Sequence, residues 1–261
     1  MTVTLRTLAP GRPGAPLVVL AHGLEDTWSS WRRLAAHLDP DWRLVALDLP
    51  WRAGNDYQWG DRTAARWLAE GLDLVGARPD ALIAHSYGAN AALGLLSAGD
   101  PALADVVALI CPLYRSPEDP VTWSMFDRAR STFEAHVRES VRARMEKRAA
   151  ARDPAVMQTM MTFALDRVGP SGFLTVFQQF VASAQLPLER IGARTLVIAG
   201  TDDPTLSPRA ARKLGGRIPG GRLLINDGYD HFCHIRRARD AARTIAEFVT
   251  ESTTITVGDI R

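Results

Sequence analysis

Side chains that can act together in nucleophilic catalysis occur along this 261-residue chain in a fixed order. Ser86 is followed far downstream by Asp202 and Asp203, and then by His231 and His234. A serine hydroxyl is a weak nucleophile at neutral pH, so a histidine must accept its proton and an aspartate usually orients that histidine. The residue types therefore predict acyl chemistry on Ser86, with one downstream histidine as base and one aspartate as its partner.

The surroundings of Ser86 favour this chemistry. Residues 81–84 form a short apolar run, and residues 89–94 are mostly small, which predicts a strand, a tight turn and a helix. A nucleophile on such a turn needs small residues two positions before and after it, because a larger side chain would collide with the neighbouring backbone. Ala84 and Gly88 meet this requirement. Glycine is more usual at both places, so Ala84 is a mild departure. We therefore predict that Ser86 lies on a sharp strand-to-helix turn.

The remaining elements follow one repeating pattern. Six short apolar runs have the composition of strands buried on both faces; they are residues 17–21, 44–47, 81–84, 106–110, 195–199 and 222–225. Apolar residues spaced three and four apart predict helices between and after them, at about 27–38, 62–76, 87–98, 207–215 and 234–250. This α/β alternation predicts a mostly parallel central sheet flanked by helices.

The alternation stops between residues 113 and 187. The sequence of this interval predicts helices at roughly 122–150, 154–167 and 171–184, with no convincing strand between them. Pro154 and Pro170 mark the helix boundaries. We therefore predict two parts. Residues 1–112 and 188–261 form the α/β core, and residues 113–187 form an inserted, all-helical cap in which most of the substrate specificity is expected to lie.

Three motifs carry a resemblance to the α/β-hydrolase superfamily over nearly the whole chain. They are Ala-His-Ser-Tyr-Gly at 84–88, Gly-Thr-Asp-Asp-Pro at 200–204 and Asp-Gly-Tyr-Asp-His-Phe at 227–232. Each follows a predicted strand, so all three fall at the carboxyl edge of the sheet, where open α/β sheets place their sites. The resemblance implies the α/β-hydrolase fold, with an acid and then a histidine following the nucleophile.

The resemblance also selects among the downstream candidates. The family's Gly-x-x-Asp spacing implies Asp203 as the acid, and Asp202 remains an alternative that could instead cap the next turn. His231 matches the loop-borne histidine just before the last helix, whereas His234 is expected inside that helix. Because Asp230 stands where the family often has glycine, His234 remains an alternative base.

The negative oxygen of a tetrahedral intermediate needs preorganised hydrogen-bond donors. In the family, the backbone N–H after a His-Gly pair supplies one of them, which implies Leu24 in the segment His22-Gly23-Leu24. The second is implied to be the backbone N–H of Tyr87, directly after the nucleophile. His22 is expected to support this loop rather than to transfer protons.

Two tryptophans are candidates for substrate contact. Trp28 and Trp51 lie near the predicted carboxyl edge of the sheet, where a ligand would bind. Packing in the core is the alternative for both.

Composition excludes several classes of function. The 31 basic and 29 acidic side chains nearly cancel and form no dense basic stripe, so a nucleic-acid partner is not expected. Cys111 and Cys233 are too few for a disulfide framework and lack metal-ligand spacing, and no phosphate-binding glycine loop occurs, so we expect neither a metal nor a cofactor. Without a signal-peptide pattern or a long apolar run, a cytoplasmic protein with no membrane partner is expected. The oligomeric state stays open.

These observations predict a serine hydrolase that cleaves a carboxylic ester, lactone or thioester of a small molecule through an acyl-enzyme on Ser86. The first alternative keeps the same three residues in an acyltransferase or cyclase, a carbon–carbon bond hydrolase or a cofactor-free peroxidase. The second is a non-catalytic receptor on the same fold. The resemblance implies aspartate at the nucleophile position in haloalkane dehalogenases and epoxide hydrolases, so Ser86 weighs against both.

Overall fold

A computed structural model describes the chain except for residues 1, 56–58, 61, 100–102, 150–152 and 259–261. Its described residues contain a seven-stranded sheet with the order β1-β3-β2-β4-β5-β6-β7. The strands are β1 (Thr4–Ala9), β2 (Leu17–Ala21), β3 (Arg43–Asp48), β4 (Ala81–His85), β5 (Val106–Ile110), β6 (Arg194–Gly200) and β7 (Arg222–Asn226). β1 pairs antiparallel with β3, and all other neighbours are parallel. The predicted mostly parallel sheet is confirmed.

The six apolar runs correspond to β2 to β7, whereas β1 was not predicted. Its sequence, Thr-Leu-Arg-Thr-Leu-Ala, mixes polar and apolar residues without a continuous apolar run. It is largely exposed, because this strand lies at the edge of the sheet and pairs on one side only. Continuous apolar runs are expected of strands that are covered on both faces, and an edge strand does not need one. The position of β1 is set by its backbone pairing with β3, and the sequence of β1 alone does not indicate that pairing.

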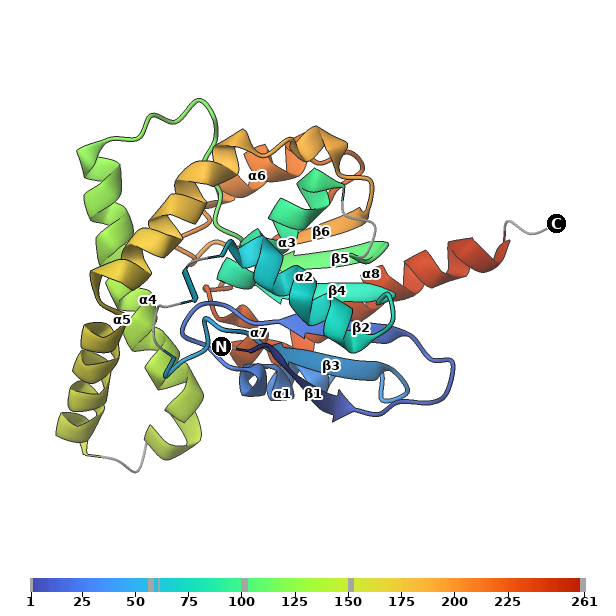
Figure 1. The fold of residues 1–261 in the computed structure, drawn as a ribbon, viewed down its shortest axis with the longest axis horizontal. Helices are drawn as coiled ribbons and strands as arrows, with labels where there is room; N and C mark the ends of the chain where they lie inside the picture. The colour runs from blue at the N-terminus through green and yellow to red at the C-terminus, as the bar shows by residue number, and fades with distance from the viewer. Residues whose placement is uncertain (1, 56–58, 61, 100–102, 150–152, 259–261) are drawn as a thin grey trace.

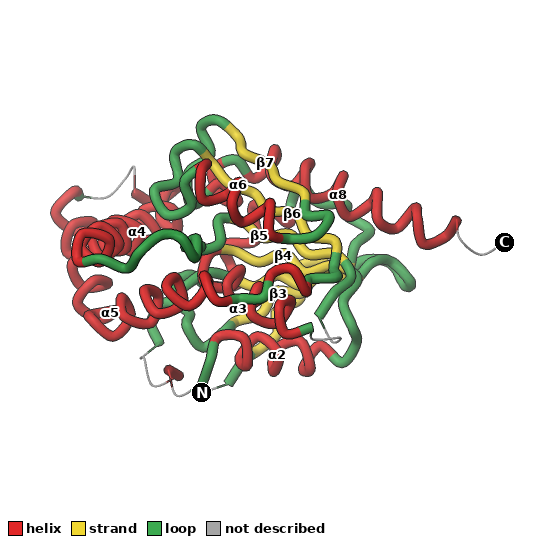
Figure 2. Tube along the Cα trace, turned by 90° about the horizontal axis from the view of Figure 1, so that it is seen from above, coloured by secondary structure: helices red, strands yellow, loops and turns green. Residues whose placement is uncertain are grey.

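Helices cover both faces of the sheet (Figures 1 and 2). The core on one face joins the strands to α2 (Ala64–Val75), α3 (Ser86–Ala98) and α6 (Pro208–Arg217). The core on the other face joins them to α1 (Arg32–Ala35), α7 (Cys233–Arg236) and α8 (Ala238–Gly258). Successive residues of one strand alternate between these cores: Val19 and Ala21 enter the first, and Val18 and Leu20 enter the second.

Two predicted helices are divided in the structure. The expected helix at 27–38 is a 3-10 turn, Trp28–Trp31, followed by the single turn of α1. The expected helix at 234–250 is divided at Arg237, whose φ of −115° and ψ of 35° lie outside the helical range. This break separates α7, which follows the His231 loop directly, from the longer α8.

The inserted helical cap lies between β5 and β6, at one end of the sheet (Figure 1). It contains α4 (Trp123–Ala149) and α5 (Pro154–Ala182), followed by 3-10 turns at Ser183–Gln185 and Leu188–Arg190. The two helices predicted at 154–167 and 171–184 form one element, kinked at Gly169, where φ is 55° and ψ is −168°. The division of the chain at residues 113 and 187 stays a prediction.

Within the described residues, no helix combines the length and apolar composition needed to cross a membrane.

A close backbone approach at the end of β6 generates a prediction about stability. A Cβ added to Gly200 would lie 1.8 Å from the carbonyl oxygen of Tyr229, in the loop that leads to His231. Gly200→Ala must therefore push this loop away from β6, and such overpacking costs about 1–3 kcal/mol of unfolding free energy. In thermal denaturation we expect a Tm lower by roughly 2–12 °C.

The matched control is Gly192→Ala, because an added Cβ there has no described atom within 4 Å and the backbone needs no positive φ. Equal Tm values for the two variants would contradict the tight approach.

Candidate active site

Ser86 occupies the sharp turn between β4 and α3. Its φ of 50° lies in the left-handed region, which residues other than glycine rarely adopt. The turn is possible because α3 approaches β2 closely: a Cβ on Gly88 would lie 2.5 Å from the carbonyl oxygen of His22. The small residue required two positions after Ser86 is thus explained by a backbone contact. Such strain at a partly buried hydroxyl that faces a cavity is characteristic of functional turns.

Ser86, His231 and Asp203 form one hydrogen-bonded chain. The Oγ atom of Ser86 lies 2.9 Å from Nε2 of His231, and Nδ1 of the same ring lies 3.1 Å from Oδ2 of Asp203. His231 comes from the loop between β7 and α7, and Asp203 comes from the loop after β6. A ring that donates from Nδ1 to the carboxylate keeps Nε2 free to accept the serine proton.

The structure brings Asp203, and not Asp202, to this chain. Asp202 is exposed, and its carboxylate accepts a hydrogen bond from the hydroxyl of Thr201. Asp203 is 3% exposed and also accepts a hydrogen bond from the backbone N–H of Thr205 at 2.8 Å. Burial raises the pKa of Asp203, but His231 and the Thr205 N–H together outweigh this effect and lower the pKa to about 2. The group beside the imidazole is therefore a carboxylate.

His85, directly before Ser86, connects the turn to the loop that carries His231. Its Nε2–H donates to the carbonyl oxygen of His231 at 2.8 Å. Burial, followed by the neighbouring histidines, holds the pKa of His85 well below its usual 6.5, so the ring is a neutral donor. No role was predicted for His85, because its partner lies 146 positions away in the chain.

The loop predicted to supply oxyanion donors lies against Ser86. A Cβ on Gly23 would lie 3.2 Å from Cβ of Ser86, and Leu24 and Tyr87 both line the cavity beside the serine. The N–H of Tyr87 is in the first turn of α3, where backbone donors have no acceptor within the helix. Both residues therefore lie at the cavity that contains Ser86, and the assignment of their N–H groups as oxyanion donors stays a prediction.

His22 supports this loop, as expected. Its Nδ1–H donates to the carbonyl oxygen of Gly23 at 2.8 Å, and its Nε2 accepts from the N–H of Leu49 at 3.0 Å. Burial lowers the pKa of His22 despite the nearby carboxylates of Asp26 and Asp48. With both ring nitrogens engaged, His22 acts as a neutral brace.

A cavity of about 700 Å³ opens over Ser86. Much of its wall is apolar and comes from the two cap helices: Met125, Phe133, Val137, Phe173, Val176, Phe177 and Phe180. Polar side chains of the cap, among them Arg128, Thr132 and His136, complete this wall. The cap is predicted to carry specificity, and its methionines, Met125 among them, are candidates for an apolar lid. The sequence does not single out the other wall residues, since apolar side chains at helical spacing are equally typical of a core.

Neither tryptophan proposed as a substrate contact lines this cavity. Trp51 is 1% exposed, packs against Tyr87, and donates from its indole N–H to the carbonyl oxygen of His22. Trp28 lies at a separate surface hollow beside β1, with the guanidinium of Arg32 over its ring. The prediction is corrected: core packing, the alternative, describes Trp51, and Trp28 is partly buried against the core on the α1, α7 and α8 face.

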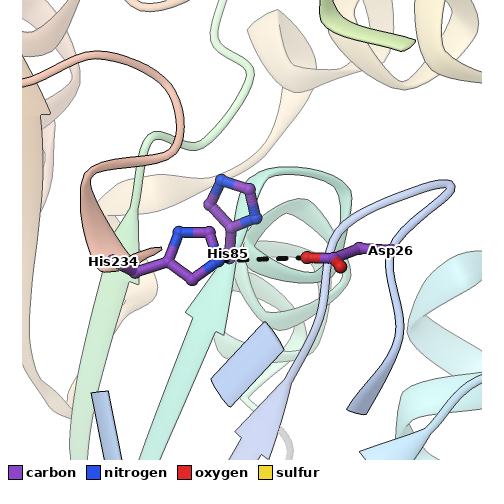
Figure 3. Close-up of side chains that lie close together, drawn as sticks. All are labelled: Asp26, His85 and His234. Carbon is purple, nitrogen blue, oxygen red and sulfur yellow. Dashed lines mark ion pairs between the residues drawn. The ribbon is translucent and has the colours of Figure 1, made fainter. Parts of the chain in front are cut away.

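His234, the alternative base, lies in a different cluster (Figure 3). It is fully buried, its ring lies 4.0 Å from that of His85, and its Nε2 is 3.9 Å from Oδ2 of Asp26. The candidate ligand atoms of these three residues lie within 4.8 Å of one another. Tetrahedral zinc needs ligand atoms about 3.3 Å apart, so the cluster would have to contract to hold that ion.

Comparisons with known proteins agree with this architecture. A model of the alpha/beta hydrolase family matches residues 18–244. Epoxide hydrolase A from Mycobacterium tuberculosis is 26% identical over 309 aligned positions, which cover 95% of this chain and 94% of that protein.

Solved structures are similar over comparable lengths. The enol-lactonase from Burkholderia xenovorans superposes with a TM-score of 0.68 and 22% identity, covering 95% of this chain and 96% of its own. The bromoperoxidase from Bacillus anthracis gives a TM-score of 0.69 and 17% identity, covering 95% of each chain. These likenesses concern the fold. Because the family model matches most of the sequence, the chain belongs to the alpha/beta hydrolase family.

Proposed function

We propose that this protein is a serine hydrolase that cleaves a carboxylic ester, lactone or thioester of a small, largely apolar molecule. The observation that carries the proposal is the hydrogen-bonded chain from Ser86 through His231 to Asp203, which ends at the floor of an apolar cavity. A serine, a neutral acceptor and an ionised aspartate in this order form the arrangement that activates a hydroxyl for acyl transfer.

In the first half of the reaction, Oγ of Ser86 attacks the acyl carbon while Nε2 of His231 takes the hydroxyl proton. The carbonyl oxygen becomes negative and accepts hydrogen bonds from the backbone N–H groups of Leu24 and Tyr87. Asp203 stabilises the imidazolium that forms. His231 then donates its proton to the departing alcohol or thiol, and the acyl group remains on Ser86.

The second half reverses the roles. A water molecule enters the position of the leaving group, and His231 removes one of its protons as its oxygen attacks the acyl-enzyme. The same two backbone donors stabilise the second tetrahedral intermediate. Its collapse returns the proton to Oγ of Ser86 and releases the carboxylic acid.

The cavity supports the choice of substrate class. A volume of about 700 Å³ is in the range of small-molecule sites, and phenylalanines from α5 dominate one wall. Apolar walls favour an acyl or alcohol portion that is itself apolar, because its burial removes apolar surface from water. We expect esters and lactones with an aryl or medium-chain alkyl acyl group to be turned over faster than the acetate esters of the same alcohol.

Epoxide opening is a second candidate, favoured by the 26% identity with epoxide hydrolase A. Ser86 stands where the family resemblance implies aspartate for that class, so the proposed acyl chemistry is preferred. A panel of aryl epoxides beside the matching aryl esters separates the two candidates, since diol formation without ester cleavage would reverse the preference.

The nucleophile is tested with a fluorophosphonate probe, which forms a covalent bond with an activated serine. We expect the wild type to label and Ser86→Ala not to label, with ester turnover lower by about 10⁴–10⁶-fold. Ser97→Ala, at the other end of α3, is the matched control and should label like the wild type. Labelling of Ser86→Ala at the wild-type rate would refute the assignment.

The acid is tested by comparing two adjacent aspartates. Asp203→Asn should lower kcat by about 10³–10⁴-fold, because the amide no longer stabilises the imidazolium or fixes the ring tautomer. Asp202→Asn should stay near wild type, since that side chain is exposed and accepts a hydrogen bond from the neighbouring Thr201 hydroxyl. The reverse result would move the acid to Asp202.

The charge of Asp203 can be tested against pH. Because the pKa of Asp203 is lowered to about 2, its carboxylate stays charged from about pH 4 upward and should not limit activity there. Carbon-13 NMR of the Asp203 carboxyl carbon should therefore show no protonation step above about pH 4. A step in that range would contradict the lowered pKa.

A further inference from the structure

His136, on cap helix α4, lies flat on the imidazole of His231. The two ring centroids are 4.2 Å apart and the ring planes differ by only 13°. The other aromatic neighbours of His231 approach at an angle: Phe232 at 86° and His85 at 56°. Among the described rings, His136 therefore provides the face-to-face contact with His231.

This stacking restricts a motion that the hydrogen bonds of His231 leave less restricted. The bonds to Asp203 and Ser86 leave the ring at Nδ1 and Nε2, whose donor and acceptor directions lie in the plane of the imidazole. Bonds in that plane hold the ring against rotation within the plane but oppose tilting out of the plane less strongly. A second ring lying flat on one face opposes the tilt and keeps the Nε2 lone pair directed at the serine.

The partner ring is itself anchored and neutral. Nδ1 of His136 lies 3.2 Å from Oγ1 of Thr205, the residue whose backbone N–H binds Asp203. Burial, and then the proximity of His231, lowers the pKa of His136 to about 3, with Asp203 opposing the shift. A neutral aromatic face attracts a cation, whereas a second imidazolium would repel it.

Contacts of the cap on both sides of the site hold α4 in this position. Ser140 donates to the backbone carbonyl of Glu25, in the loop after the oxyanion donor, at 3.4 Å. Glu139 pairs with Arg236 of α7, beyond the His231 loop. Arg167 of α5 pairs with the buried carboxylate of Glu25. The ring of His136 thus comes from the cap. Its position is fixed by contacts with the loop that contains Glu25 and with α7, which follows the His231 loop.

We propose that His136 is a positioning residue: its ring holds the imidazole of His231 at the angle needed to accept the Ser86 proton, and it stacks on the imidazolium that forms. The proposal rests on the proposed serine chemistry. It makes formation of the acyl-enzyme depend on the cap being seated, so the cap acts on the reaction rate as well as on substrate choice.

Three substitutions separate the ring from its hydrogen bond. His136→Phe keeps a flat ring and loses the bond to Thr205; His136→Gln keeps a polar partner for Thr205 and loses the ring; His136→Leu loses both. Glu134→Gln is the control on the same helix, because Glu134 forms an exposed pair with Arg130 and does not line the cavity. Thermal denaturation of all four variants verifies that they are folded.

The readouts are the rate constant for fluorophosphonate labelling of Ser86, and kcat and KM for an aryl ester. We expect His136→Gln and His136→Leu to lose about 10–100-fold in labelling rate and kcat with little change in KM, as for other small misplacements of a catalytic group. His136→Phe should recover most of this loss, and Glu134→Gln should match the wild type.

Three results would overturn the proposal. The first is a wild-type labelling rate in both His136→Gln and His136→Leu, and the second is a loss of labelling rate in His136→Phe equal to that in His136→Leu. The third is a change confined to KM, which would make His136 only part of the cavity wall. If the wild type itself does not label, the proposed function fails and this inference fails with it. If the wild type labels and the ring-free variants label equally fast, only the role of His136 is lost. Should His136→Leu not fold, the comparison of the Phe and Gln variants still decides the matter.

Discussion

The close approach of the start of α3 to the end of β2 is the constraint on which the site depends. Gly88 lies so near the carbonyl oxygen of His22 that no Cβ fits between them, and this contact accompanies the left-handed conformation of Ser86. The same segment of β2 leads directly into Gly23 and Leu24. This one backbone contact therefore fixes the position of Ser86 relative to the proposed oxyanion donors, independently of the side chains in the loops.

The sheet and the three hydrogen-bonded side chains were predictable because their signals are local. A strand covered on both faces is largely apolar, and β2 to β6 each contain such a run. The partly buried edge strand β7 also contains an apolar run, Leu-Leu-Ile. Loops that follow parallel strands meet at one edge, so the order of Ser86, Asp203 and His231 along the chain was enough to bring them together. β1 lacked this signal, since an exposed edge strand is defined by its partner β3 rather than by its own composition.

The rest of the site depends on contacts between distant segments. His136 is one polar residue on a long amphipathic helix, and nothing near it in sequence indicates that it stacks on a ring 95 positions later. Trp51 was proposed as a ligand contact because its loop follows a strand, yet its indole turns inward to bind the carbonyl oxygen of His22. Position at the sheet edge is encoded locally, whereas the direction in which a side chain points is decided by what packs against it.

Packing also decides which histidine can carry charge. His22, His85 and His136 lie around the site, and burial is the main cause that lowers the pKa of each. A proton taken from Ser86 thus has one suitable acceptor, His231, because only this ring bonds both the hydroxyl and the ionised Asp203 among the described residues. Neutral neighbours also spare the new imidazolium from repulsion by a second cation. His22, His85 and His136 thus form neutral surroundings in which a single positive charge can form on the neighbouring ring.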